Sequence, residues 1–529
     1  MKKIVLLLIF SFSHFLTFSF SHILTFSPSH SSAAAQLLWL EKAPKRELRA
    51  VWVTTLSGLD WPRTKATSQA SAERQKRELC LLLDQLRRAN VNTVLLQTRV
   101  RGSVIYPSGW EPWDACLTGQ YDKSPGYDPL QFAIQEAHRR GMELHAWMVM
   151  IPAFKVEVAR RMGGKSLLHT HPELLKRHEG QYYLDPGLPG TADYLAGILA
   201  DFIERYDVDG VHFDYIRYPE NAAAFSDGAT YKKYGQGKPK AQWRRDNITA
   251  IVRRLYQEVK AKKPWVVMSC SPVGKYRDTR RYSSRGWNAY EAVFQDAQGW
   301  LREGIQDALW PMMYFTGDHF YPFAVDWQEG SYGRHVAPGL GIYFLHPQER
   351  DWDLSVVTRE MHYLRRNGLA GQAFFRSRFL TDNVKGLYDY LQRTFYPYPA
   401  LPPRYPWNDS IAPAKPKDFT LEGGLLRWRA DGEEPGGLRY NVYASAQAPV
   451  DAGRAENLVA PLLPTPEYRF DRLTLMACGL HLAVTAIDRS GNESEAAQLD
   501  LSSCRPPSRI PLTPLGKPVA HRGQRGAKE

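Results

Sequence analysis

Between residues 47 and 395, short apolar runs alternate eight times with longer amphipathic or loop segments. The apolar runs are continuous, which is typical of parallel strands that are covered on both faces. The eight predicted strands are 49–55, 91–98, 143–150, 210–216, 266–271, 308–315, 336–343 and 370–375. Eight strand–helix units over roughly 350 residues predict an α/β fold, a (β/α)8 TIM-type barrel spanning residues 45–396.

Amphipathic segments separate these strands and predict helices. The clearest are 72–88, 128–140, 191–205, 246–262 and 290–302. An open, doubly wound sheet is the alternative topology for such a pattern. No Gly-x-Gly-x-x-Gly motif follows the first predicted strand, so dinucleotide binding lacks its main signature.

The composition changes after residue 396. Residues 397–412 are rich in proline and predict a linker. Residues 413–504 contain short alternating runs separated by turn residues, which predicts a small all-β sandwich of about 90 residues. Within it, Trp428 and the segments 440–443 and 483–494 resemble a fibronectin type III module. Such a module would space or dock a catalytic domain.

Both ends of the chain have distinctive sequences. Residues 1–35 combine Lys2 and Lys3, an apolar stretch and three alanines, which predicts a secretory signal peptide. The protein is therefore expected in the periplasm, the cell envelope or the extracellular space; an uncleaved membrane anchor is the alternative, and no other stretch approaches spanning length. Residues 505–529 hold six Lys or Arg, one Glu and five Pro, which predicts a basic, disordered tail.

Basic residues are in excess along the whole chain, with 68 Lys plus Arg against 55 Asp plus Glu. Residues 231–263 alone carry eleven basic and two acidic side chains. A solvated helix face explains this stretch, and attraction to a polyanion is the alternative. For an exported protein an acidic glycan or cell wall is the favoured polyanion, and no helix-turn-helix, RNP or zinc-finger pattern indicates nucleic acid.

Cysteine and histidine patterns bear on cofactors. The five cysteines, Cys80, Cys116, Cys270, Cys478 and Cys504, show no Cys-x-x-Cys spacing. Cys478 and Cys504 are the pair to test for a disulfide.

No second ligand lies at a metal-binding spacing from the histidine of the third strand, so no catalytic metal and no cofactor are predicted. Gly-x-Ser-x-Gly is absent, which weighs against an esterase of the α/β-hydrolase type.

The fourth predicted strand carries the best catalytic candidate. Because side chains alternate along a strand, Gly210, His212 and Asp214 share one face, and Asp214 lies near the carboxyl end, where barrel active sites form. A carboxylate beside His212 and near Arg217 suits a nucleophile or an acid/base. In the alternative, Asp214 forms an ion pair with Arg217 or a neighbouring arginine and has a structural role. Asp209 lies at the opposite end and is expected to be a turn or cap residue.

Neighbouring strand ends supply candidate substrate-binding groups. Gln97 and Arg99 share a face with Leu95 and could bind sugar hydroxyls or a carboxylate, or Arg99 could brace Asp214. Aromatic residues in the loops suggest platforms for sugar rings. The predicted substrate-binding residues are Gln97, Arg99, Arg101, Trp113, His145, Trp147, His212, Arg217, Tyr314, Asp60 and Asp326.

An ordered series of segments resembles the glycosyl hydrolase-like 10 family of bacterial proteins. The matching segments are 47–53, 97–102, 105–108, 111–119, 141–147, 184–187, 209–219 and 271–274. The resemblance implies a TIM-type barrel in an exported protein that hydrolyses glycosidic bonds, and characterised relatives of this type cut peptidoglycan strands lacking stem peptides. It also implies that Asp214 is a catalytic carboxylate.

Two departures from the family pattern concern the catalytic partner. Many members have a second Asp where this chain has Tyr215, and Gln where it has Met312. Glu111, Asp60 and Asp326 are candidates for the second carboxylate, in falling order. A substrate acetamido group could instead supply the nucleophile.

The sequence thus predicts an exported glycoside hydrolase acting on a polysaccharide, with peptidoglycan glycan strands as the favoured substrate and Asp214 and Glu111 as catalytic carboxylates. The rival hypothesis is a catalytically inactive, glycan-binding barrel retained at the cell wall. A polyanion-binding scaffold that depends on residues 505–529 is a third possibility. The oligomeric state is left open.

Overall fold

The computed structural model describes residues 43–470 and 481–500. The predicted signal peptide, Cys478, Cys504 and the predicted basic tail lie outside these ranges. Cys80, Cys116 and Cys270 are free thiols. Within the described ranges, the helices are all too short or too polar to cross a membrane.

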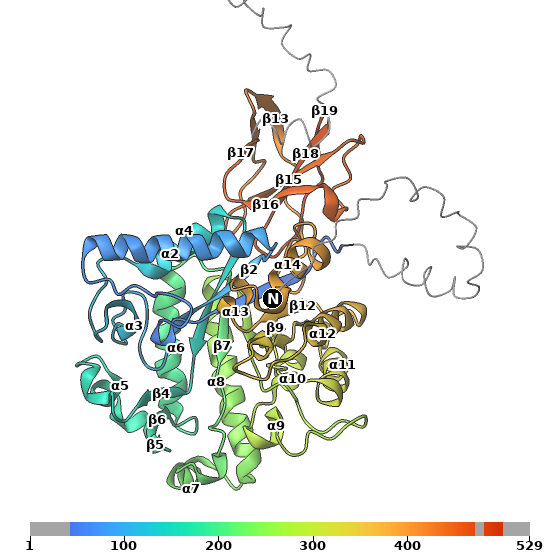
Figure 1. The fold of residues 1–529 in the computed structure, drawn as a ribbon. Helices are drawn as coiled ribbons and strands as arrows, with labels where there is room; N and C mark the ends of the chain where they lie inside the picture. The colour runs from blue at the N-terminus through green and yellow to red at the C-terminus, as the bar shows by residue number, and fades with distance from the viewer. Residues whose placement is uncertain (1–42, 471–480, 501–529) are drawn as a thin grey trace, which may run out of the picture. The chain divides into compact units, whose positions relative to one another are not determined.

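A parallel sheet forms the centre of the larger region (Figure 1). Its strands run in the order β10-β9-β8-β7-β3-β2-β1-β12-β11. Their bounds are β1 Leu48–Val53, β2 Thr93–Arg99, β3 Glu143–Val149, β7 Gly210–Asp214, β8 Val267–Cys270, β9 Ala308–Leu309, β10 His335–Val336, β11 Gly339–Leu340 and β12 Gly371–Phe374. Each of the eight predicted strands is found, in the predicted order.

The two edges of this sheet are parts of one interrupted strand. Ala337 N donates to Leu309 O (2.9 Å) beside β9, and Ala373 N of β12 donates to Pro338 O (3.0 Å). The segment 335–340 therefore bonds to both neighbours, and the sheet closes into a barrel with eight strand positions. The closed parallel sheet confirms the predicted α/β barrel and excludes the open, doubly wound alternative.

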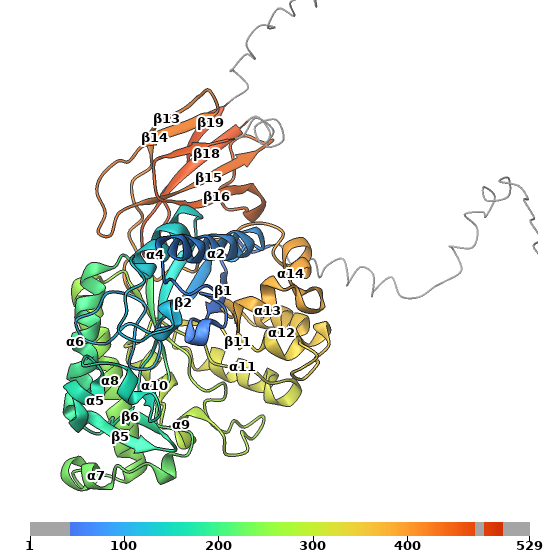
Figure 2. The same ribbon diagram turned by 60° about the vertical axis from the view of Figure 1, so that its left-hand side comes forward.

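Helices surround the barrel, and α2 lies beside α4 and α6 beside α8 (Figures 1 and 2). The main helices between successive barrel strands are α2 Gln69–Arg88, α4 Pro129–Arg139, α6 Pro189–Arg205, α8 Lys240–Lys262, α10 Ala297–Arg302, α11 Tyr321–Glu329 and α12 Leu354–Arg366. α2 begins at a capping box in which Ser68 and Ser71 satisfy each other's backbone N–H groups. Its Leu79, Leu83 and Leu86 are buried in the same cluster as the outward residues of the strands, so replacing one by Ala should cost about 2–5 kcal/mol.

Short elements complete this region. They are α3 Ala115–Thr118, α5 Leu167–Thr170, α7 Gly228–Tyr234, α9 Ala289–Ala292, α13 Ser377–Thr381 and α14 Leu387–Tyr390. A small antiparallel sheet, ordered β4-β6-β5, follows β3 and consists of β4 Pro152–Lys155, β5 Leu175–His178 and β6 Gln181–Leu184.

The barrel interior is a separate apolar cluster. It consists of Leu48, Ala50, Trp52, Leu95, Trp147, Ala308, Trp310, Ala337 and Ala373. Glycines make room for the large rings: a Cβ on Gly210 would lie 2.5 Å from His145 Nδ1, and one on Gly339 would lie 2.9 Å from the Trp52 indole. Large and small inward residues thus interlock, and the interior is packed rather than hollow.

Antiparallel strands make up the C-terminal region. One sheet has the order β13-β14-β17, and the other β16-β15-β18-β19. Their bounds are β13 Lys417–Glu422, β14 Leu425–Arg429, β15 Arg439–Ser445, β16 Leu458–Leu463, β17 Glu467–Arg469, β18 His481–Ile487 and β19 Ala497–Asp500. Leu426 and Trp428 of the first sheet share a buried cluster with Val442 and Val484 of the second, so the two sheets form one core.

Asp209 connects the base of the barrel to this antiparallel region. Its Oδ2 accepts from Leu144 N (2.8 Å) and pairs with His138 Nε2 (2.8 Å), and its Oδ1 pairs with Arg439 and with Arg489 (3.1 Å). Burial opposes ionisation, but Arg439, His138 and Arg489 together hold the pKa of Asp209 well below its usual value. Asp209 lies at the barrel base, as its position in the sequence predicts, but it is the centre of a buried ion-pair cluster rather than the expected turn or cap residue.

Replacing Asp209 by Asn should lower the free energy of unfolding by about 3–5 kcal/mol, because the buried Arg439 loses its counter-charge and Arg489 keeps only Asp207. The midpoint of urea denaturation measures this loss. The matched control is Asp207→Asn, since Asp207 also pairs with Arg489 but its side chain is 57% exposed. This substitution should lower the free energy of unfolding by less than about 1 kcal/mol. Equal losses in the two variants would contradict a structural role specific to Asp209.

Candidate active site

Asp214 is the last residue of β7, and its side chain lies at the carboxyl end of the barrel strands. It is 6% exposed. Trp147 Nε1 donates to Oδ2 (3.1 Å), while Tyr215 N (2.7 Å) and Ser271 Oγ (3.2 Å) donate to Oδ1. Three donors from three different strands or strand ends therefore fix the orientation of this carboxyl group.

The protonation of Asp214 depends on its surroundings. Burial raises the pKa of Asp214 above the usual carboxyl value, although Arg217 and the three hydrogen-bond donors oppose this shift. Among residues 43–470 and 481–500, Arg217 pairs with Glu220 (3.2 Å) and makes no ion pair with Asp214. Asp214 is therefore not neutralised by a salt bridge, and a raised pKa suits a group that gives a proton to a leaving oxygen.

Tyr215 has an unusual backbone conformation. Its φ is 51°, in the left-handed region that aromatic residues seldom adopt. This conformation accompanies the bond from Tyr215 N to the carboxyl group of the preceding residue, Asp214. The guanidinium of Arg217 lies 4.6 Å from the Tyr215 ring centroid, so the two side chains stack beside the carboxyl group.

Aromatic rings line the same end of the barrel. Phe375 lies 5.5 Å from Tyr314 and 6.4 Å from Trp147, measured between ring centroids. Burial raises the pKa of Tyr314 well above its usual value, and the neighbouring Asp214 adds to this shift. Tyr314, Tyr343 and Phe375 are half-buried, so this surface could stack on a sugar ring. Phe375 was missing from the predicted site, although its place at the end of the eighth predicted strand could have indicated it.

The two inward histidines lie in the packed interior. His212 Nδ1 bonds to Ser269 Oγ (2.9 Å), and its ring lies 5.0 Å from Trp310. Burial lowers the pKa of His212 well below its usual value, and His145 adds to this, so His212 is neutral. The His145 ring lies 5.6 Å from the Trp310 ring, and His145 is fully buried. In this structure neither histidine is exposed to a substrate.

Gln97 points inward as predicted but serves the loop after β1. Its Oε1 accepts from Thr54 Oγ1 (2.8 Å), Thr55 N (3.0 Å) and Leu56 N (2.9 Å). Gln97 therefore fixes the conformation of the first strand–helix loop at the barrel mouth.

Arg99 does not share the face of Gln97, because a bulge interrupts the end of β2. Gln97 pairs with Trp147 but Arg99 pairs with Met148, and Met148 belongs to the outer core. The side chain of Arg99 accordingly contacts Glu111 and the backbone carbonyl groups of residues 149 and 150. The expectation from strict alternation does not hold here.

Each of the three candidate partner carboxylates is bound by groups other than Asp214. Glu111 forms a bidentate pair with Arg99 (2.6 and 2.8 Å) and accepts from Tyr194 Oη (3.1 Å). Asp60 accepts from Thr54 N (2.9 Å) and pairs with Arg376. Asp326, on α11, accepts from Gln298 Nε2 (3.1 Å) of α10, in the outer helical layer.

The remaining predicted residues lie in the mouth loops. Trp113 is half-buried against the outer core. Arg101 is half-buried, bonds to Gln181 Oε1 (3.4 Å) and acts electrostatically on Tyr215. The structure thus brings together Asp214, Trp147, Arg217 and Tyr314, with Arg101 nearby. Over the described ranges, no group of three His, Cys, Asp or Glu is arranged to hold a metal ion.

Replacing Glu111 by Gln should destabilise the fold rather than remove a catalytic group. The Arg99 guanidinium, which is 1% exposed, would lose its counter-charge, so we expect a loss of about 3–5 kcal/mol in the urea unfolding free energy. Glu73→Gln is the control, because Glu73 pairs with Lys76 at the surface, and it should cost less than about 1 kcal/mol. Lost activity at unchanged stability would instead place Glu111 in the catalytic machinery.

Comparison with known proteins bears on this arrangement. The family model "Glycosyl hydrolase-like 10" matches residues 47–338. The chain is 32% identical over 481 residues to glycosyl hydrolase YngK of Bacillus subtilis (strain 168), a match that covers 86% of this chain and 93% of YngK. It is 33% identical over 290 residues to glycosyl hydrolase DigH of Escherichia coli (strain K12), covering 51% of this chain and 65% of DigH.

A solved structure is also similar. The glycoside hydrolase domain of PgaB (BpsB) from Bordetella bronchiseptica aligns with a TM-score of 0.45 at 15% identity, covering 66% of this chain and 98% of that domain. The match to the family model spans strands β1 to β10 and the residues around Asp214. The chain belongs to the glycosyl hydrolase-like 10 family.

Proposed function

We propose that this protein is an exported glycoside hydrolase that cleaves peptidoglycan glycan strands, with Asp214 as its catalytic acid. The observation that carries the proposal is a buried, oriented carboxyl group with a raised pKa at the carboxyl end of a barrel strand. The aromatic surface of Tyr314 and Phe375 beside it is the kind that sugar rings stack on. Membership of a glycosyl hydrolase-like family supports the reaction class.

In the proposed reaction, Asp214 gives its proton to the glycosidic oxygen as the bond from that oxygen to C1 of an acetamido sugar breaks. The acetamido oxygen of that sugar attacks its C1 and forms a cyclic oxazolinium intermediate. Water then adds to C1 and returns a proton to Asp214. This route needs one enzyme carboxyl group, which agrees with Glu111, Asp60 and Asp326 being bound to other partners. The sugars of peptidoglycan carry the required acetamido group.

The rest of the chain would serve localisation. Residues 1–35 would act as the signal peptide, which leads to the periplasm or cell envelope. The two antiparallel sheets in residues 413–504 would form a fibronectin type III-like module that docks on the barrel through Arg439 and Arg489.

The rival proposal is a barrel that binds glycans without cleaving them. It is favoured by one observation: each candidate for a second carboxylate is held by other groups of the protein. A barrel that binds glycans without cleaving them would use the same aromatic surface and the same arginines at the barrel mouth.

Cleavage of peptidoglycan strands stripped of stem peptides tests both proposals. We expect shorter saccharides from the wild type, detected by mass spectrometry, and a rate about 10²–10⁴-fold lower for Asp214→Asn, because proton donation is lost. Asp318→Asn changes an exposed carboxylate in a nearby loop and should cleave like the wild type. Equal cleavage by Asp214→Asn and the wild type would remove Asp214 from the mechanism. Binding without cleavage by any of the three proteins would establish the rival.

The pH dependence of kcat/KM should follow the protonation of Asp214. A catalytic acid is active while protonated, so activity should fall as pH rises through its pKa, which burial places above the usual carboxyl range. Trp147→Phe removes a hydrogen-bond donor that stabilises the charged form of Asp214, so the pKa of Asp214 should rise. The alkaline limb of the profile should then shift to higher pH by about one unit. Trp287→Phe, at an exposed indole, should leave the profile in place. A limb that moves down, or that does not move, would contradict Asp214 as the acid.

A further inference from the structure

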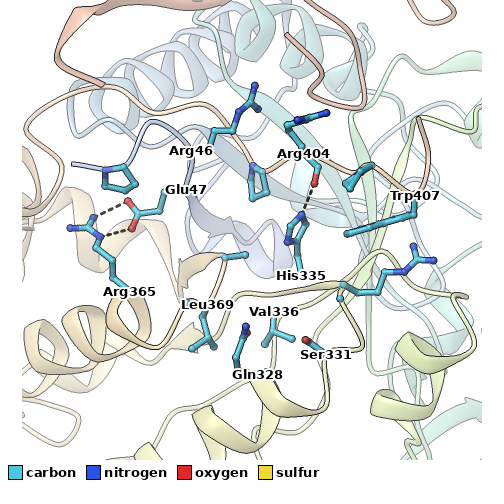
Figure 3. A pocket seen from close by; sticks show the side chains of 17 residues that line it. Arg46, Glu47, Gln328, Ser331, His335, Val336, Arg365, Leu369, Arg404 and Trp407 are labelled. Atoms are coloured by element: carbon cyan, nitrogen blue, oxygen red, sulfur yellow. Dashed lines mark hydrogen bonds and ion pairs between the residues drawn. The ribbon is translucent and has the colours of Figure 1, made fainter. Parts of the chain in front are cut away.

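A groove with a volume of about 630 Å³, drawn in Figure 3, lies at the amino ends of the barrel strands, whereas Asp214 lies at their carboxyl ends. It is bordered by the residues that precede or begin β1, β10 and β12, which are the amino ends of parallel strands. The linker residues Arg404 and Trp407 form another wall. Because catalysis in barrels takes place at the carboxyl ends of the strands, this groove is not part of the candidate active site.

Positive charge dominates the lining of this groove. It includes the side chains of Arg46, Arg334, Arg365 and Arg404 and one carboxylate, Glu47. Glu47 is bound by Arg365 through two hydrogen bonds of 2.8 and 2.9 Å, which Figure 3 shows at one side of the groove. Among the described residues that line the groove, no other carboxylate balances the charge of the remaining three arginines.

Within the described residues, these arginines either share a carboxylate with another basic side chain or form no ion pair with one. Arg46 lies 3.4 Å from Glu493, which pairs more closely with Lys45 (2.5 Å). Arg404 donates to the neutral amide oxygen of Asn492 (2.6 and 3.2 Å), and within residues 43–470 and 481–500 it makes no ion pair with a carboxylate.

The third arginine, Arg334, lies 3.3 Å from Asp307, which is bound at 2.7 Å by Lys260. Burial lowers the pKa of Arg46, and the charge of Arg404 contributes to that shift, so these two guanidinium groups repel each other. The groove therefore has an excess of positive charge that an anion would relieve.

The other walls suit a sugar. Trp407 is half-buried: the Arg334 guanidinium lies 4.4 Å and the His335 ring 5.1 Å from its ring centroid, which leaves the exposed part of the indole for a ligand. Gln328 and Ser331 add polar side chains on the opposite side. Guanidinium groups bind carboxylates in a planar, bidentate geometry, and indoles pack against the C–H faces of sugars. The volume lies within the range of about 300–1,000 Å³ that is usual for ligand sites.

We propose that this groove is a second, non-catalytic binding site for a carboxylate-bearing glycan, whose acid groups are bound by Arg46, Arg404 and Arg334. The class of ligand rests on the proposed function, whereas the location and charge of the groove do not. The site would hold a segment of an acidic polymer away from the active site and so increase the time that the enzyme spends on it.

Binding of stem-peptide-free peptidoglycan strands, whose lactyl carboxylates are unblocked, tests this proposal. All proteins carry Asp214→Asn to keep the strands intact. Adding Arg404→Gln should raise Kd by about tenfold, because a charge-assisted contact is lost. Adding Arg74→Gln instead removes the same charge from an exposed part of α2 and should leave Kd unchanged. An unchanged Kd for Arg404→Gln, or equal binding of strands whose carboxylates are converted to methylamides, would overturn the proposal.

Hydrogen–deuterium exchange covers the case in which Arg404→Gln fails to fold. With the groove unaltered in the Asp214→Asn protein, added strands should slow exchange in peptides spanning 328–336 and 403–407. Unchanged exchange in those peptides would overturn the proposal. Cleavage of short soluble fragments by Arg404→Gln in the otherwise wild-type protein should equal that of the wild type, so a failed groove and a failed hydrolase are distinguishable.

Discussion

Closure of the parallel sheet is the constraint from which the rest of the barrel follows. The segment 335–340 bonds to β9 on one side and β12 on the other, so alternate residues of every strand must point into one enclosed space. Trp52, Trp147 and Trp310 fill that space with the help of small residues such as Gly210 and Gly339. With the interior packed, an inward polar side chain near the carboxyl end of a strand can meet solvent and substrate only at the mouth.

Asp209, just before β7, and Asp214, at its end, have different roles because their surroundings differ. Asp209 and Asp214 lie at the two ends of β7 and both are buried. Asp209 faces two arginines and a histidine, which hold its pKa low and make it a structural anion. Asp214 faces one distant arginine and three neutral donors, which do not offset burial, so its pKa is raised. The same residue type is a structural anion at one end and, in the proposed reaction, a proton donor at the other.

The two ends of the barrel also differ in what they could bind. The mouth combines a carboxyl group with aromatic rings, the groups on which the proposed glycosidase reaction depends. The base combines three under-compensated arginines with Trp407, a surface suited to retaining an acidic chain without reacting with it. An enzyme acting on a polymer gains from such a division, because binding energy at a remote site keeps the substrate close to the catalytic group.

The sequence by itself determined the eight strands, their order and the inward face that carries Asp214, because a period of two and continuous apolar runs are local properties. It also indicated the aromatic mouth and the family. Only the tertiary structure decided the role of Arg99, since one bulge in β2 turned its side chain to the outer layer. The same holds for Glu111, which is bound by Arg99 and by Tyr194 from a distant helix. The groove at the base likewise joins residues 46, 334 and 404, which are separated by at least 70 positions in the sequence. Such contacts depend on how elements pack, which no local pattern encodes.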